Sequence, residues 1–265
     1  MIPKLSIITV NLNNKNGLID TAKSVVAQTW TDYEWIIIDG GSTDGSVEVI
    51  KEYADKTDKL VYWCSEPDGG IYQGMNKGIE KASGEYCWFL NSGDYAYKNT
   101  TLAEIFANEF DEDIVYGDVE IKRMDGSFLL HRQKGKLTLP LFVYAGPAHQ
   151  GILTKRKLLN RMGRYSENYK ISADWGFYLK SIHKNNALCK KIPIVYSVVV
   201  SGGISNSENF EKEHKNERKQ LFKEIFPNNY FFIYFFCFFS EFSFRNKSYL
   251  FRKFFAKKFF HRSID

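Results

Sequence analysis

Polar side chains that can bind a ligand or a cation follow four apolar runs in the first hundred residues. These polar residues are Thr9 and Asn11, Asp39 with Ser42, Asp68 with Asn76, and Asp94 in the segment NSGD. An acid placed against an apolar strand costs free energy unless a hydrogen-bond donor or a cation meets it. Four such clusters therefore indicate one polar binding site rather than four isolated helix caps.

The apolar runs have the pattern of buried parallel strands. They cover residues 5–10, 34–39, 60–64 and 85–90, and segments with helical spacing separate them. Repeated strand–helix units predict a mainly parallel sheet with right-handed crossovers. Ligands of such sheets bind beyond the carboxyl ends of the strands, so the four polar clusters should meet at one edge.

The second half of the chain has a looser pattern. We expect strands at 113–116, 127–131 and 194–200, and helices at 155–162, 173–185 and 208–223. Residues 137–151 contain Pro140 and Pro147 and are expected to form a loop.

Composition excludes several classes of protein. The chain has 265 residues, of which 44% are hydrophobic and 25% charged, and these values fit neither a disordered chain nor a polytopic membrane protein. Residues 228–265 hold 16 aromatic side chains and a net charge of +5, so the rest of the chain sums to zero. A neutral body argues against a nucleic-acid-binding protein.

The compartment is expected to be the cytoplasm. The first ten residues read as a strand and not as a signal peptide. The four cysteines are scattered without a C-x-x-C pair, so we expect reduced thiols. The longest apolar run, 230–239, is too short to span the ~30 Å core of a bilayer as a helix.

Several segments resemble a known enzyme family. In order along the chain, the segments KLSIITVNLNN, EWIIIDGGSTDGS, SEPDGGIYQGMNKGIEKASGEYCWFLNSGD and ISADWGFYL are similar to the successive motifs of family 2 glycosyltransferases with the GT-A fold. More narrowly, they resemble bacterial enzymes that add sugars during surface-polysaccharide assembly. The resemblance covers roughly residues 3–205.

The resemblance implies an α/β architecture. The expected fold is GT-A, a Rossmann-like, mainly parallel sheet with helices on both faces. Residues 1–205 would form this domain, with a nucleotide-sugar-binding half at 1–110 and an acceptor-binding half at 111–205. Residues 206–265 would form a helical, aromatic and basic tail.

The resemblance also assigns the donor site. Its residues are Thr9, Asn11 and Asp39 for base and ribose, Ser42 in the following turn, Asp68 and Asn76 in a second nucleotide-facing segment, and Gly202, Gly203 and Ser205 near the diphosphate. A carboxylate at position 39 can accept the imide N–H of uracil, which favours a UDP-sugar donor.

The same motifs also imply a metal-binding residue and a general base. Asp94 matches the last acid of the family's Asp-x-Asp-type motif, which coordinates a divalent cation (Mg²⁺ or Mn²⁺) on the donor diphosphate. Asn91 and Gly93 stand where relatives often have acids, so metal affinity without donor should be weak. Asp174 matches the general base that deprotonates the acceptor hydroxyl, although it can also cap the helix that it opens.

Two residues of the second half remain candidates with open roles. His149, in GPAHQG, can line the acceptor pocket, contact phosphate or complete the metal site, or it is a plain loop histidine. Asp118, in VYGD, can line the pocket of the donor sugar.

The residue pattern of the tail suggests that it binds a membrane surface. Phe251, Phe254, Phe255 and Phe259 repeat at helical spacing, and lysines and arginines occupy other positions. A basic helix with an aromatic face fits the interface of a membrane, where a lipid-linked acceptor would be met. The alternative is a C-terminal helical subdomain or an oligomer interface.

We therefore predict an inverting, metal-dependent glycosyltransferase. It would move a sugar from a nucleotide-sugar donor to a hydroxyl of a saccharide or lipid-linked saccharide in cell-surface polysaccharide biosynthesis, peripheral to the inner face of the membrane. One alternative is a catalytically degenerate nucleotide-sugar-binding or scaffold protein, which the thinned metal motif leaves open. Another is a nucleotidyltransferase, although NLNNKNG has only one glycine for a triphosphate loop.

Overall fold

One continuous nine-stranded sheet organises the chain in the computed structural model, which describes residues 2–133, 135–144, 146–201 and 208–233. The strand order is β3-β2-β1-β4-β8-β6-β9-β5, and β7 pairs with β6. The strands are β1 (Leu5–Asn11), β2 (Tyr33–Asp39), β3 (Leu60–Ser65), β4 (Tyr86–Phe89), β5 (Tyr95–Ala96), β6 (Ile114–Lys122), β7 (Phe128–His131), β8 (Ile152–Lys155) and β9 (Cys189–Val200).

The N-terminal half of the sheet is parallel. β1 pairs in parallel with both β2 and β4, and β2 pairs in parallel with β3. Every residue of β1 and β2 is buried, as expected for central strands covered on both faces. The register aligns Asn11 with Asp39 and Asp39 with Ser65, so three polar residues lie side by side at the carboxyl edge. The predicted meeting of polar clusters at this edge is confirmed for these strands.

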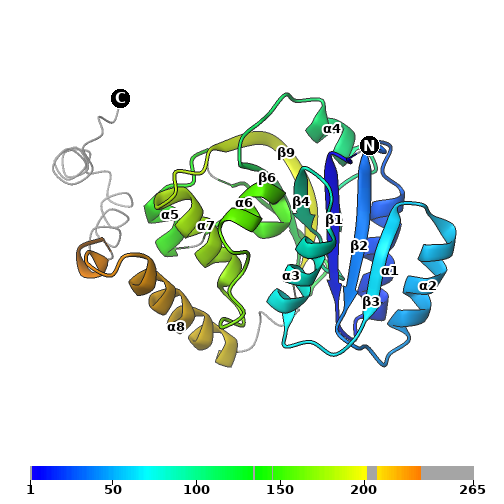
Figure 1. The fold of residues 1–265 in the computed structure, drawn as a ribbon, viewed down its shortest axis with the longest axis horizontal. Coiled ribbons are helices and arrows are strands. Elements are labelled where there is room, and N and C mark those ends of the chain that lie inside the picture. Colours follow the sequence, from blue (N-terminus) through cyan, green and yellow to red (C-terminus); the bar gives the residue numbers. More distant parts are fainter. Residues whose placement is uncertain (1, 134, 145, 202–207, 234–265) are drawn as a thin grey trace.

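Helices cover both faces of the sheet (Figure 1). They are α1 (Lys15–Val26), α2 (Ser46–Lys56), α3 (Ile71–Lys81), α4 (Thr101–Phe106), α5 (Leu139–Tyr144), the 3₁₀ turn η1 (His149–Gly151), α6 (Arg156–Arg161), α7 (Ala173–His183) and α8 (Glu208–Ile225).

The core has two layers because side chains alternate along each strand. Ile8 and Val10 of β1 pack in the layer that also holds residues of α3, α6, α7 and α8. Leu5 and Ile7 pack in the opposite layer with α1, α2 and α4. The predicted α/β class, with a mainly parallel sheet and helices on both faces, is confirmed.

The second half of the sheet is more mixed than the first. β8 runs antiparallel to β4 and to β6, whereas β9 runs parallel to β6. The same sheet thus continues from the predicted half 1–110 into the predicted half 111–205. The division into these two functional halves stays a prediction.

The expectation of a loop at 137–151 was wrong. This segment contains α5 and η1, and Pro140 lies in the first turn of α5, where its missing N–H is not needed by the helix. β8 follows directly and was not expected, because four residues are too few for a clear pattern. The strands expected at 113–116 and 194–200 are longer, since β6 and β9 pair along most of their length.

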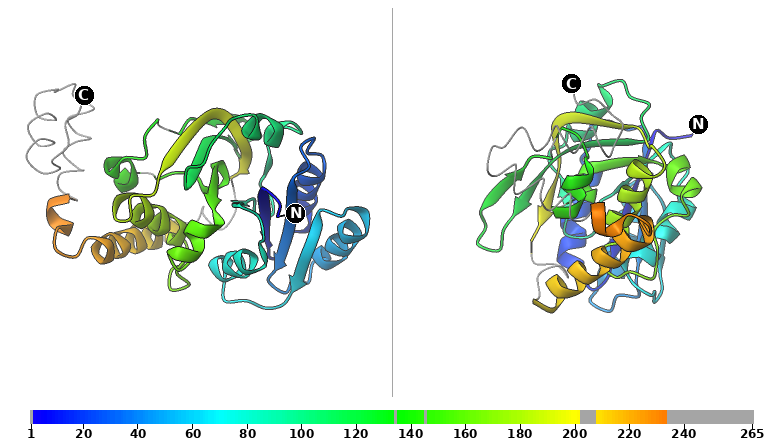
Figure 2. Two further views of the ribbon diagram at one scale, coloured as in Figure 1. Left: turned by 45° about the horizontal axis from the view of Figure 1, so that its top comes forward. Right: turned by 90° about the vertical axis from the view of Figure 1, so that its left-hand side faces the viewer.

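α8 packs on α7, at the opposite end of the molecule from α2, as Figures 1 and 2 show. Its residues Leu221 and Phe222, and Phe226 directly after it, are buried in the layer that also holds residues of α7. Within the described ranges, no helix combines the length and apolar character needed to cross a membrane. Most of the predicted tail, 234–265, lies outside the described residues.

Candidate functional site

The turn after β2 is built around the carboxylate of Asp39. This side chain is fully buried, and its Oδ1 accepts hydrogen bonds from Asn11 Nδ2 (2.6 Å) and Ser42 Oγ (2.6 Å). Its Oδ2 accepts from Ser65 Oγ (2.6 Å) and from the backbone N–H groups of Ser42 (2.8 Å) and Gly41 (3.2 Å). Burial alone would raise the pKa of Asp39, but the donors from Ser42, Ser65 and Asn11 hold that pKa below its usual value.

Asn11 and Asp68 lie at the same turn. The side chain of Asn11 donates to Asp39, and its buried carbonyl oxygen Oδ1 has no hydrogen-bond donor in the described part of the chain. A Cβ added to Gly40 would lie 3.3 Å from the Asp68 carboxylate, so Asp68 faces this turn closely. The structure therefore brings together Asn11, Asp39, Ser42 and Asp68, as the sequence predicted.

Asp94 lies in the turn that follows β4. Its carboxylate is almost completely buried, and it accepts from Gln150 Nε2 at 2.9 Å and from the Val200 N–H at 3.1 Å. Burial raises the pKa of Asp94, and the hydrogen bond from Gln150 only partly offsets this effect. Because burial makes the ionised form of this carboxylate costly in the free protein, a cation that arrives with a ligand would be a suitable partner for it.

His149 and Asp174 form a hydrogen-bonded pair. His149 Nδ1 lies 2.9 Å from Asp174 Oδ2, and each side chain keeps only about a sixth of its surface exposed, 17% and 16%. Burial alone would lower the pKa of His149, but Asp174 raises it; burial alone would raise the pKa of Asp174, but His149 lowers it. The pair therefore favours an ionised carboxylate at neutral pH.

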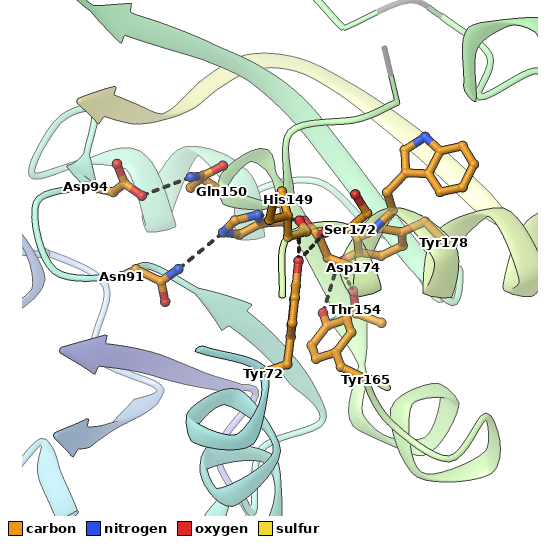
Figure 3. Close-up of polar contacts among 12 residues, drawn as sticks. Tyr72, Asn91, Asp94, His149, Gln150, Thr154, Tyr165, Ser172, Asp174 and Tyr178 are labelled. Carbon is orange, nitrogen blue, oxygen red and sulfur yellow. Dashed lines mark hydrogen bonds and ion pairs between the residues drawn. The ribbon is translucent and has the colours of Figure 1, made fainter. Parts of the chain in front are cut away.

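Tyr72 supports Asp174 from α3. Its hydroxyl oxygen lies 2.8 Å from Asp174 Oδ1 and 2.6 Å from the Ile171 carbonyl oxygen, and the Trp175 N–H donates to the same Oδ1 at 2.8 Å. Burial raises the pKa of Tyr72 well above its usual value, so the phenol stays protonated and can donate. Figure 3 shows Tyr72 and His149 meeting Asp174 through separate contacts.

Consecutive residues of η1 connect the two acids of the site. His149 contacts Asp174, and Gln150 contacts Asp94, as Figure 3 shows. Asn91, from the same turn as Asp94, places its Nδ2 3.4 Å from His149 Nε2. The acid proposed for the metal and the acid proposed as base thus flank a single short segment.

Three predicted site residues point elsewhere. Thr9 Oγ1 accepts from the Trp35 indole N–H inside the core, and Asn76 donates to the Tyr165 carbonyl oxygen and to Glu167. Asp118 forms an ion pair with Lys191 at 2.9 Å. Their ligand-binding roles stay predictions, and Gly202, Gly203 and Ser205 lie outside the described residues.

The oxygen atoms near Asp94 provide only part of the ligands that a divalent cation needs. In the described ranges no three His, Cys, Asp or Glu side chains are grouped closely enough to hold a metal by themselves. The turn does offer the Asp94 carboxylate and the buried Oδ1 of Asn91, which accepts from no donor in those ranges. Two such oxygens fit Mg²⁺ or Mn²⁺ only if a ligand supplies most of the remaining oxygens.

Sequence reasoning missed Tyr72 and Gln150. Tyr72 lies inside a quoted motif (GIYQG), but nothing in its type or position marked it as a contact of an acid 102 residues away. Gln150 directly follows His149, and no periodic pattern marks it. Both contact acids that are distant in sequence, so a folded structure was needed to find them.

The sequence matches the family model described as "Glycosyl transferase family 2" over residues 6–249. The match reaches well beyond residue 205, where the resemblance was expected to end, and includes α8. The chain is 32% identical over 214 residues to a PGL/p-HBAD biosynthesis glycosyltransferase of Mycobacterium bovis (strain BCG / Pasteur 1173P2). This alignment covers 77% of this chain and 80% of the relative.

Solved structures share the fold. S. aureus TarS 1-349 in complex with UDP-GlcNAc superposes with a TM-score of 0.63 at 19% identity, covering 86% of this chain and 73% of that one. A longer TarS chain is covered to 43%, so this chain spans less than half of it. The mannosyltransferase PcManGT from Pyrobaculum calidifontis in complex with GDP-Man and Mn²⁺ superposes with a TM-score of 0.65 at 15% sequence identity. The superposition covers 86% of this chain and 65% of that one.

Proposed function

The chain belongs to glycosyltransferase family 2, and we propose that it transfers a sugar from a nucleotide-sugar donor to an acceptor hydroxyl with inversion at the anomeric carbon. One observation carries this proposal: the adjacent residues His149 and Gln150 of η1 contact Asp174 and Asp94, respectively, so the two acids lie on either side of η1. A direct displacement needs both functions, charge neutralisation at the leaving diphosphate and a base at the incoming hydroxyl.

The donor would bind at the carboxyl ends of β1, β2 and β3. There Asn11 Oδ1, which has no donor among the described residues, and the carboxylates of Asp39 and Asp68 gather around one turn. An acceptor atom in this position can receive the imide N–H of uracil, which favours a UDP-sugar. The UDP-GlcNAc bound to TarS is consistent with this donor class but belongs to a structure of only 19% identity.

The cation would be held by Asp94 and the Asn91 amide oxygen together with the donor diphosphate. A divalent cation supplies positive charge that stabilises the leaving diphosphate. The PcManGT complex contains Mn²⁺ with its nucleotide sugar, which supports the choice of metal without placing one in this chain. Asp94 would bind the cation more tightly when the donor is present than when it is absent.

Asp174 would remove the proton from the acceptor hydroxyl. Its ionised form is favoured by His149, and Tyr72 and the Trp175 N–H fix the orientation of its Oδ1. His149 would act through Asp174 as a positioning residue, since its Nδ1 is committed to the carboxylate. One carboxylate at this place gives a single displacement and therefore inversion.

The acceptor would be a saccharide or a lipid-linked saccharide of cell-surface polysaccharide biosynthesis. The mycobacterial relative is named for PGL/p-HBAD biosynthesis, which supports a surface glycoconjugate without identifying this chain's acceptor. The aromatic and basic residues of 228–265 would hold the enzyme at an anionic membrane surface where a lipid-linked acceptor is found. A cytoplasmic location and a homo-oligomer stay predictions.

The proposal is tested by transfer itself. The purified protein is incubated with UDP- and GDP-sugars, Mn²⁺ or Mg²⁺ and lipid-linked saccharide acceptors, and nucleotide release is followed. We expect turnover with a UDP-sugar and a product whose anomeric configuration, measured by NMR, is opposite to that of the donor. A product with retained configuration would contradict the mechanism, and nucleotide binding without transfer to any acceptor would favour a degenerate binding protein.

A further inference from the structure

α8 reaches the segment that carries Asp174 through the side chain of Glu217. The Glu217 carboxylate accepts three consecutive backbone N–H groups: Lys170 at 2.7 Å, Ile171 at 3.0 Å and Ser172 at 2.9 Å. Hydrogen bonds from N–H groups to a carboxylate are stronger than those between neutral groups. Three of them on one side chain fix the path of the backbone immediately before α7.

Among the described residues, no side chain of this segment caps the start of α7. Ser172 occupies the N-cap position of α7, but its side chain makes no capping hydrogen bond, and its buried Oγ finds no partner in the described part of the chain. An N-cap side chain ordinarily satisfies free N–H groups at the start of a helix. Here Glu217, which lies on α8, accepts hydrogen bonds from the N–H groups just before α7. Its negative charge also interacts favourably with the N-terminus of α7.

α8 contacts the residues on the other side of Asp174 as well. The guanidinium of Arg218 lies 5.2 Å from the Trp175 ring, and a Cβ added to Gly176 would come within 2.8 Å of the Leu221 side chain. Glycine at 176 therefore permits the close approach of α8 to the first turn of α7. Burial lowers the pKa of Arg218 to about 10, and the charge of Asp174 opposes this effect, so the two groups lie within electrostatic reach.

The contacts of Asp174 depend on this backbone. Tyr72 binds both the Ile171 carbonyl oxygen and Asp174, while Glu217 binds the Ile171 N–H. A shift of residues 170–172 would therefore move the carboxylate relative to both Tyr72 and His149. Misplacement of a catalytic group by about 1 Å can cost on the order of 10²-fold in rate.

We propose that Glu217 is a positioning residue for the reaction. Through Glu217, α8 would fix the backbone before α7 and so keep Asp174 within hydrogen-bond distance of His149. This inference rests on the proposed role of Asp174 as base and extends it to a helix that the sequence pattern assigned to a tail. Glu217 touches no reacting atom and acts only through the backbone of 170–172.

The test compares Glu217→Ala and Glu217→Gln with Glu213→Ala. Glu213 lies one turn earlier on the same helix and only approaches Lys170 Nζ at 3.8 Å, so it controls for the loss of a surface acid. Three quantities are measured: hydrogen exchange of the peptide 168–176, the ¹⁵N shifts of the His149 imidazole, and transfer kinetics. The imidazole signal is assigned with His149→Gln.

We expect Glu217→Ala to speed exchange in 168–176 at least tenfold and to change the His149 shifts toward those of an imidazole without a carboxylate partner. The kcat should fall more than tenfold while the KM for the donor stays within about twofold. Glu217→Gln keeps one acceptor oxygen and should recover part of each effect, and Glu213→Ala should behave as wild type.

Unchanged exchange and His149 shifts in Glu217→Ala would overturn the proposal. So would a loosened 170–172 segment with normal kcat, or an equal effect in Glu213→Ala. Should Glu217→Ala not fold, the Gln variant carries the same comparison. The exchange and imidazole measurements need no substrate, so a failure to find any donor or acceptor would count against the proposed function and not against this inference.

Discussion

The imidazole Nδ1 of His149 lies 2.9 Å from Oδ2 of Asp174, although the two residues are 25 positions apart in the sequence. The contact joins η1 to the first turn of α7, and it gives Asp174 a partner that keeps its carboxylate ionised. The arrangement keeps this carboxylate ionised in a largely buried site, as the proposed role of Asp174 as the base requires.

Removal of the carboxylate tests the base directly. Asp174→Asn should lower kcat on the order of 10² to 10⁴-fold, because the amide cannot accept the proton of the acceptor hydroxyl. Binding of UDP with Mn²⁺, measured by calorimetry, should be retained. The control is Asp55→Asn, an exposed acid on α2. Near-normal turnover in a folded Asp174→Asn protein would exclude Asp174 as the base.

Removal of the imidazole should move the pH profile. His149 lowers the pKa of Asp174, and the proposed mechanism requires the ionised carboxylate, so the acid limb of kcat should follow this pKa. In His149→Gln the pKa of Asp174 should rise and the acid limb should shift to higher pH, with a smaller loss of kcat at neutral pH than in Asp174→Asn. His131→Gln, on β7, serves as the control. An unshifted limb would show that His149 does not act on Asp174.

Asp94→Asn should separate stability from metal-dependent binding. Burial raises the pKa of Asp94, so folding makes the ionised carboxylate costly, and its replacement by a neutral amide should leave the melting temperature unchanged or higher. The additional thermal stabilisation by UDP with Mn²⁺ over UDP with EDTA should disappear. A variant that still shows the full Mn²⁺-dependent shift would contradict a metal site at this turn.

Asp39 should be important for folding as well as for any ligand. Asp39→Asn replaces an acceptor oxygen with an amide group that faces donors, and we expect a loss of about 3 kcal/mol in the free energy of unfolding. Urea unfolding with an unchanged m-value measures it, with Asp20→Asn, an exposed acid of α1, as control. A loss below that of the control would contradict the prediction.

The same variant predicts a pH effect. The pKa of Asp39 is lowered in the folded protein, so its contribution is complete above the unfolded pKa and is lost as pH falls through the folded value. Below about pH 4 the wild type should therefore lose stability with falling pH more steeply than Asp39→Asn. Parallel curves for the two proteins would mean that Asp39 is not specially stabilised as an anion.

The tail can be tested apart from the folded body. A chain that ends at residue 233 keeps the packing of Tyr230 and Ile233 against the core, and it should fold as the full chain does. It should lose binding to vesicles that contain anionic lipid, in a sedimentation assay with neutral vesicles as control. Equal binding by both chains to anionic vesicles would end the membrane proposal for this segment.

Part of the fold and of the proposed donor site could be predicted from sequence. Strands β1, β2 and β4 are buried on both faces, so they appear as continuous apolar runs, and the polar residue that ends each run must lie at one edge of a parallel sheet. Asp39 and Ser42 are three residues apart, and their contact is a property of one turn. Local patterns are sufficient for such features.

The part of the site that is proposed to carry out catalysis depended on the tertiary structure. Gln150 and Asp94 are 56 residues apart, and Glu217 and Ser172 are 45 apart, with no periodic signal to pair them. β8 is only four residues long, yet it joins β4 to β6 and so brings η1 between Asp94 and Asp174. The amino-acid sequence determined which groups could do chemistry, whereas the packing of short, weakly patterned elements decided which of them meet, because that choice depends on contacts between distant parts of the chain.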